Sequence, residues 1–150
     1  MTFQYKMESV AKLFQKISEL KKKDEKIEAL RLNNNLAVRT VLAGWFDPNI
    51  KFLLPPGTPP FKESKFDEPK AFMLEIPRFY LFVEGGNPNL KQIKREQLFI
   101  EMLERVNADD AKILLSMKDK KCPFKGITKE LVDAAFPGFC LLYTSDAADD

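Results

Sequence analysis

The segment at residues 53–60, with the sequence LLPPGTPP, contains four prolines within eight residues. Proline lacks the backbone N–H that helices and sheets use, so no regular element continues through this segment. The chain must therefore build its core from the segments on either side. Phe52 and Phe61 flank the prolines, and we expect their rings to hold an irregular loop against the core. A polyproline II ligand for an aromatic groove is the alternative.

The first third of the chain has helical periodicity. Its apolar residues recur at the i, i+3, i+4 and i+7 spacing, which predicts a helix from about Met7. This apolar stripe consists of Val10, Leu13, Phe14, Ile17 and Leu20. A polar turn follows, and Asp24 is the expected N-cap of a second helix through Arg31. A third helix is predicted over residues 35–44, with Trp45 buried at its end.

The middle third combines aromatic residues with chain breakers. Residues 71–83 are rich in phenylalanine and contain Pro77, which predicts a bent or restarted helix. Two short strands are the alternative, because aromatic residues also favour sheets. Glycine and proline at residues 85–88 then break the chain.

The final third is helical again. A helix is predicted over residues 90–106, and Asn107 is the expected N-cap of the next one. Thr128 is the expected N-cap of a last helix, which Pro137 and Gly138 close. The sequence therefore predicts an all-α, single compact domain of about six or seven short helices, spanning residues 1–139, with the irregular Pro-rich loop in its middle.

Residues 140–150, CLLYTSDAADD, break with the rest of the chain. This segment reads as the translation of a transposon-end adapter used in sequencing libraries, so we interpret it as a non-native tail and expect the native C-terminus to lie beyond Phe139. Without its three aspartates, 24 basic residues face 19 acidic ones, a net charge of +5 instead of +2. Without Cys140, a single cysteine remains, which excludes an intrachain disulfide.

Composition argues against an enzyme. The sequence contains no histidine, which excludes catalytic triads and imidazole–zinc sites. It contains no Gly-rich phosphate loop, and Cys122 precedes a proline and has no histidine partner. We therefore expect no catalytic residue, no metal and no cofactor. No apolar run is long enough for a membrane span, so no membrane association is expected.

The main candidate binding segment is basic and runs from residue 112 to residue 129, with six lysines and one acid, Asp119. Its second half begins a helix, where free backbone N–H groups and the helix dipole favour a phosphate. Glycine at this point allows another backbone to approach closely. The candidate nucleic-acid-binding residues are Lys118, Lys120, Lys121, Lys125, Gly126, Thr128 and Lys129.

Two alternative interpretations concern basic segments. The lysines of residues 112–129 can equally form a solvated face that keeps the protein soluble. A second basic segment, residues 21–23, is followed at once by Asp24 and Glu25, and we interpret it as an ordinary polar turn.

Short motifs at both ends resemble a known domain type. The motifs are LFQKI at residues 13–17, Met117-Lys118-Asp119, Gly126 after a basic loop, and Phe136-Pro137-Gly138. Together they resemble the all-helical N-terminal DNA-binding domain of ATP-dependent DNA ligases from tailed bacteriophages. Residues 52–61 and 118–126 are also similar to a family of uncharacterised tailed-phage proteins. The ligase resemblance implies contacts to duplex phosphates from the basic segment.

These observations lead to two functional hypotheses. The first is a non-enzymatic, phage-encoded accessory domain that binds duplex DNA through its phosphates with little sequence preference. The second is a protein-interaction or virion-associated module that contacts a phage or host protein through the Pro-rich loop and the aromatic residues of 72–82. The expected location is the cytoplasm of an infected bacterial host, or the virion. An exposed apolar patch around Phe79, Tyr80 and Phe82 favours the second hypothesis, whereas a continuous lysine face free of acids favours the first.

Overall fold

The computed structural model describes residues 8–65 and 67–138, and this part of the chain is all-helical. It contains seven α-helices and one 3-10 helix, and no strand. The elements are α1 (Val10–Glu19), α2 (Lys23–Leu32), α3 (Leu36–Phe46), α4 (Lys70–Glu75), the 3-10 helix η1 (Ile76–Phe82), α5 (Gln92–Arg105), α6 (Ala108–Lys118) and α7 (Lys129–Ala135). The predicted fold class is confirmed. The adapter-like tail, residues 140–150, lies outside the described residues.

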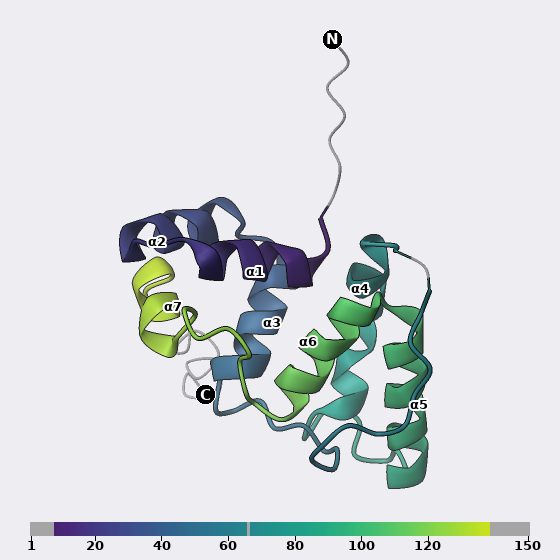
Figure 1. The fold of residues 1–150 in the computed structure, drawn as a ribbon. Coiled ribbons are helices and arrows are strands. Elements are labelled where there is room, and N and C mark those ends of the chain that lie inside the picture. Colours follow the sequence, from purple (N-terminus) through teal and green to yellow (C-terminus); the bar gives the residue numbers. More distant parts are fainter. Residues whose placement is uncertain (1–7, 66, 139–150) are drawn as a thin grey trace.

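Helices α3 and α6 lie side by side at the centre of the molecule (Figure 1). Helices α1 and α2 cross one end of this pair, and α7 packs against α2. Helices α4 and α5, with η1, lie on the other side of α6 (Figure 1). This arrangement places α7, and the end of the basic loop that leads into it, beside α1 and α2 (Figure 1).

The N-terminal helices begin close to the predicted positions. Ser9 caps α1, its hydroxyl accepting from Lys12 N at 3.3 Å, whereas Met7 lies outside the described residues. Asn35 caps α3 by accepting from Val38 N at 2.9 Å. The prediction of Asp24 as an N-cap is wrong, because α2 already begins at Lys23 and Asp24 lies within its first turn.

An aromatic cluster fills the centre of the core. The rings of Phe14 and Trp45 meet edge to face at 4.9 Å, and Phe14 stacks on Phe124 at 6.4 Å. Trp45 is 3% exposed, and its indole N–H donates to Ser116 Oγ at 2.8 Å. The predicted burial of Trp45 is confirmed, and its polar atom has a partner, as a buried indole requires.

The aromatic middle segment forms a restarted helix, as predicted. Helix α4 runs directly into η1, and Pro77 lies in the first turn of η1, where the missing N–H leaves no hydrogen bond unmade. The two-strand alternative is wrong. In the described residues, the only β-type pairing is an isolated antiparallel bridge between Phe52 and Val83.

The Pro-rich loop is irregular and is held at several points. Phe52 and Phe61 are half-buried against the core, as predicted. Leu53 N donates to Phe82 O, and Gln92 Nε2 donates to Leu53 O, both at 2.8 Å. The loop therefore lies along α5 and η1 as part of the packed structure.

Asn107 occupies the N-cap position of α6, but its side chain does not bond to that helix. Its amide oxygen accepts from Glu68 N at 2.6 Å, and its amide nitrogen donates to Asp67 Oδ1 at 3.0 Å. The side chain thus connects α6 to the segment before α4. The Thr128 cap is confirmed, since its hydroxyl accepts from Leu131 N at 3.2 Å.

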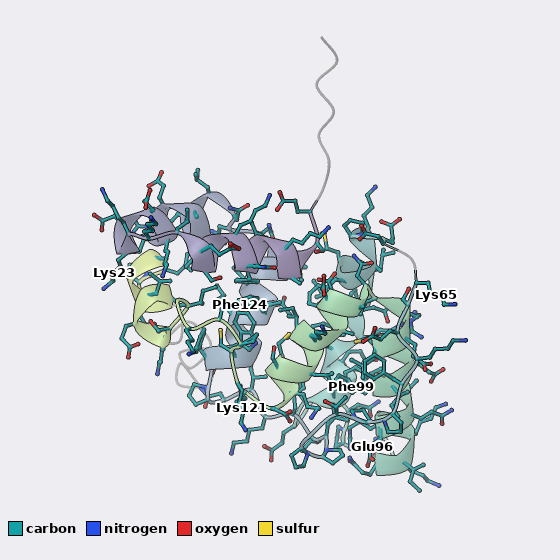
Figure 2. The ribbon with its side chains drawn as sticks, viewed as in Figure 1. Lys23, Lys65, Glu96, Phe99, Lys121 and Phe124 are labelled. Carbon is teal, nitrogen blue, oxygen red and sulfur yellow. The ribbon has the colours of Figure 1, made fainter. Side chains whose placement is uncertain are left out.

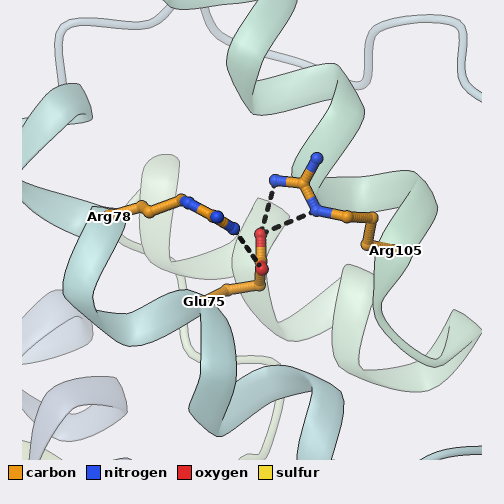
Figure 3. Close-up of polar contacts among 3 residues, drawn as sticks. All are labelled: Glu75, Arg78 and Arg105. Carbon is orange, nitrogen blue, oxygen red and sulfur yellow. Dashed lines mark hydrogen bonds and ion pairs between the residues drawn. The ribbon is translucent and has the colours of Figure 1, made fainter.

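Glu75 is a buried carboxylate that joins η1 to α5 (Figure 3). It is 4% exposed and accepts from Arg105 Nε at 3.0 Å and from Arg78 Nη1 at 2.9 Å. Both arginines are partly exposed, so the cluster buries one charge and keeps its counter-charges at the surface. This geometry avoids the large desolvation penalty of a fully buried ion pair.

None of the helices in residues 8–65 and 67–138 combines the length and the apolar character that a transmembrane segment needs.

Candidate nucleic-acid interface

The seven predicted site residues all lie between the end of α6 and the first turn of α7, but the structure separates them into two groups. The Lys118 side chain is 1% exposed. Its ammonium donates to Pro55 O at 2.9 Å and to Asp119 Oδ1 at 2.6 Å. Lys118 therefore holds the Pro-rich loop to α6 and does not lie on the surface predicted for DNA.

Lys120 also has a structural role. Its ammonium donates to Gly44 O at 2.7 Å and to Asp47 O at 2.8 Å. These carbonyls belong to the end of α3, where helical hydrogen bonds run out and a cation is favourable. Burial lowers the pKa of Lys120, and the neighbouring Asp47 opposes that change. Lys120 also has a left-handed backbone, with φ of 55°, which turns the chain out of α6.

The other predicted residues lie at or near the surface. Lys121, Lys125 and Lys129 are exposed. Thr128 is also exposed, but its hydroxyl already accepts the Leu131 N–H as the cap of α7. A phosphate at this helix start would have to compete with that cap, so the lysine side chains are the better candidates for contact.

Gly126 allows a close approach of the turn between α1 and α2, a neighbour that the sequence did not identify. A Cβ at this position would lie 2.5 Å from Lys26 Nζ and 3.0 Å from Ser18 O. The Lys26 ammonium also donates to Gly126 O at 3.4 Å. Ser18 lies in the last turn of α1 and Lys26 lies near the start of α2. The glycine therefore allows the basic loop to lie directly against this turn.

This contact brings two basic segments together. The α1–α2 turn contributes exposed lysines at residues 21–23, and the basic loop contributes Lys125 and Lys129. We call the set the lysine surface, which consists of Lys21, Lys22, Lys23, Lys26, Lys125 and Lys129. Figure 2 shows Lys23 at the α2 end of the molecule and Lys121 well apart from it, so Lys121 lies outside this surface.

The two halves of the lysine surface are held in place by helix packing. Helix α7 packs against α2. Arg31, in the last turn of α2, donates to Ala135 O at 3.0 Å and to Ala134 O at 3.1 Å. A guanidinium at the end of α7 satisfies carbonyls that the helix leaves unpaired. The two helices are thus joined at both ends, by Lys26 at one and by Arg31 at the other.

Acidic residues border the lysine surface. Asp24, Glu25 and Glu130 are exposed next to its lysines, and Glu25 accepts from Lys22 N at 3.2 Å. The surface is therefore basic but not a continuous lysine face free of acids. Any binding through it depends on a modest excess of positive charge, which salt screens efficiently.

Cys122 has no feature of a reactive thiol. It is half-buried, and burial raises the pKa of its thiol to about 11. The thiol is therefore protonated at neutral pH, and the thiolate is the nucleophilic form. In residues 8–65 and 67–138, no three His, Cys, Asp or Glu side chains are grouped in a way that suits a metal ion.

The chain belongs to the family of unknown function DUF6433, whose model matches residues 13–123. The match covers the lysine turn at residues 21–23 and the structural lysines Lys118 and Lys120, and it ends before Gly126. No curated protein and no solved structure matches the sequence.

Proposed function

We propose that the protein is a non-enzymatic, phage-encoded accessory domain that binds duplex DNA through its phosphates. The observation that supports this proposal is the Lys26–Gly126 contact, because it joins two lysine segments that lie 100 residues apart into one surface. The partner is DNA in the cytoplasm of an infected bacterium. The contact residues are those of the lysine surface, and they replace the set centred on Lys118 and Lys120.

The chemistry of the lysine surface suits phosphates rather than base edges. Lysine presents a compact, mobile charge without the planar fork that arginine uses for bidentate base contacts. Phosphate contacts position a protein on a duplex but carry no sequence information. Little sequence preference is therefore expected, and affinity comes mainly from counter-ion release.

A binding role without catalysis is supported by the available side chains. The sequence has no histidine, and burial raises the pKa of the Cys122 thiol to about 11. The buried carboxylate of Glu75 is tied to Arg78 and Arg105 in a structural role.

Charge reversal on the lysine surface tests the proposal. The triple variant Lys22→Glu, Lys125→Glu and Lys129→Glu changes three exposed side chains without removing the Lys26 contact. Fluorescence anisotropy with a labelled duplex should show an affinity at least roughly 100-fold lower than that of the unchanged chain, because each lysine represents about one released counter-ion.

A matched control distinguishes the effect of the lysine surface on DNA affinity from the effect of net charge. Lys62, Lys91 and Lys94 are also exposed but belong to the loop before α4 and the start of α5. Reversing these three changes net charge by the same amount and should lower affinity by less than about 5-fold. Equal losses in both triple variants would contradict the proposed surface.

A protein partner is the second candidate, and an apolar face on α4 favours it. Leu74 is 71% exposed and Met73 is 41% exposed. Of the aromatic residues predicted to form a contact patch, Phe82 is buried and Phe79 is half-buried, whereas Tyr80 is 53% exposed. A partner that recognises Leu74 would lose binding on Leu74→Glu, a change that leaves the lysine surface intact.

A further inference from the structure

The lysine surface keeps its positive charges unpaired. In residues 8–65 and 67–138, none of its six lysines forms an ion pair with an acidic side chain. Lys26 donates to the carbonyl oxygen of Gly126, a group without a net charge. The other lysines of this surface are exposed. Their ammonium groups are therefore available to attract phosphates.

Carboxylates lie beside these lysines at the starts of both helices. Helix α2 begins at Lys23, and Asp24 and Glu25 follow in its first turn. Helix α7 begins at Lys129, and Glu130 follows in its first turn. All three acids are exposed. The positive end of a helix dipole stabilises such carboxylates, so each helix start presents positive and negative side chains together.

Glu25 is held in place next to the lysines. Its Oε1 accepts from Lys22 N at 3.2 Å, a capping interaction at the start of α2. In the part of the chain that the structure describes, no ammonium or guanidinium pairs with this carboxylate. Its negative charge therefore stays close to Lys22 and repels a phosphate that approaches the lysine.

We propose that Glu25 and Glu130 limit the affinity of the lysine surface for duplex DNA. This inference rests on the proposed function and names the residues that regulate it. The lysines attract every duplex alike, because phosphate contacts carry no sequence information. Two carboxylates among them reduce that attraction, which keeps the binding weak and reversible and prevents retention of the protein on unrelated DNA.

Removing the two charges while keeping the side-chain shapes tests this role. Glu25→Gln keeps an oxygen that can accept from Lys22 N, and Glu130→Gln changes an exposed side chain. In fluorescence anisotropy with a labelled duplex at about 50 mM salt, the full chain with both substitutions should bind roughly 10-fold more tightly, about 3-fold for each carboxylate. This gain should shrink at about 200 mM salt, because salt screens exposed charges.

Glu63 and Glu84 provide the matched control. Both are exposed, and they lie in the loop before α4 and in the turn after η1. Replacing both by glutamine changes the net charge by the same amount and should raise the affinity by less than about 2-fold. An equal gain in the two double variants would overturn the proposal, because net charge alone would then set the affinity.

The same titrations distinguish this proposal from the proposed function. If the unchanged chain binds the duplex and the Glu25→Gln, Glu130→Gln variant binds no more tightly, only the limiting role is wrong. If neither chain binds at about 50 mM salt, both the limiting role and the proposed function are wrong. Binding by the variant alone would support the limiting role and would contradict DNA binding by the unchanged chain.

Discussion

The Lys26 ammonium donates to the carbonyl oxygen of Gly126 at 3.4 Å, although 100 residues separate the two in sequence. Glycine allows this close approach, because a Cβ at position 126 would lie 2.5 Å from Lys26 Nζ and 3.0 Å from the Ser18 carbonyl oxygen. It places the loop after α6 against the α1–α2 turn. The proposed function depends on this contact, because the contact determines which lysines share a surface.

Lys120 should be essential for stability while its neighbour Lys121 is not. Lys120→Met would leave the carbonyls of Gly44 and Asp47 without their donor, at a cost of about 1–3 kcal/mol in the free energy of unfolding. Lys121→Met, at an exposed position, should change it by less than about 0.5 kcal/mol. Urea unfolding followed by circular dichroism measures both values. Equal effects of the two substitutions would contradict the assigned role of Lys120.

Gly44 should resist substitution even though it lies inside α3. An added Cβ would lie 2.7 Å from Met117 Cε and 3.1 Å from Met117 Cβ and Cγ. Alanine gains about 1 kcal/mol in helix propensity, but overpacking between two helices costs about 1–3 kcal/mol. We therefore expect Gly44→Ala to lower the free energy of unfolding by about 1 kcal/mol. A chemical denaturation midpoint at or above that of the unchanged chain would show that α3 and α6 pack less closely than described.

Asp110 should make stability depend on pH. It is fully buried, and its Oδ1 accepts from Ala11 N at 3.0 Å. Burial raises its pKa from 3.8 to about 6; Asp109 and Asp67 add to the increase, while the Ala11 hydrogen bond and Lys12 oppose it. Because the folded-state pKa lies above the unfolded one, this group's contribution to stability is greatest below about pH 4 and falls as pH rises towards 6.

The variant Asp110→Asn tests that dependence. Its amide oxygen can still accept from Ala11 N, but it carries no charge to bury. At pH 7 the variant should be more stable than the unchanged chain by up to about 3 kcal/mol, and this advantage should vanish near pH 4. Thermal unfolding at both pH values measures the difference. A variant that is less stable at pH 7 would mean that the charged form is favoured in the fold.

Features that depend on a few neighbouring residues were predictable from sequence. Asn35 and Thr128 cap their helices because a cap needs only a side-chain oxygen and an N–H three residues later. The prolines of residues 53–60 exclude regular structure for an equally local reason. The all-helical fold follows from such local signals.

The candidate site was only partly predictable. Contacts with residues far away in the sequence decide which of its lysines are held inside the fold and which remain on the surface. Lys118, Lys120 and Lys121 look equivalent in sequence, but the first bonds to Pro55 and the second to Gly44, which belong to other segments. Asn107 was predicted to cap a helix and instead bonds to Glu68 and Asp67. No local pattern reveals a partner 39 or more residues away.

The most direct measurement is fluorescence anisotropy of the full chain with intact, nicked and single-stranded DNA between about 50 and 200 mM salt. If the lysine surface contacts about four phosphates, log K should fall against log salt with a slope of about −3.6, which is a loss of roughly 150-fold over this range. Binding should favour the intact or nicked duplex over the single strand. No binding at 50 mM salt, or an affinity that salt does not change, would contradict the account.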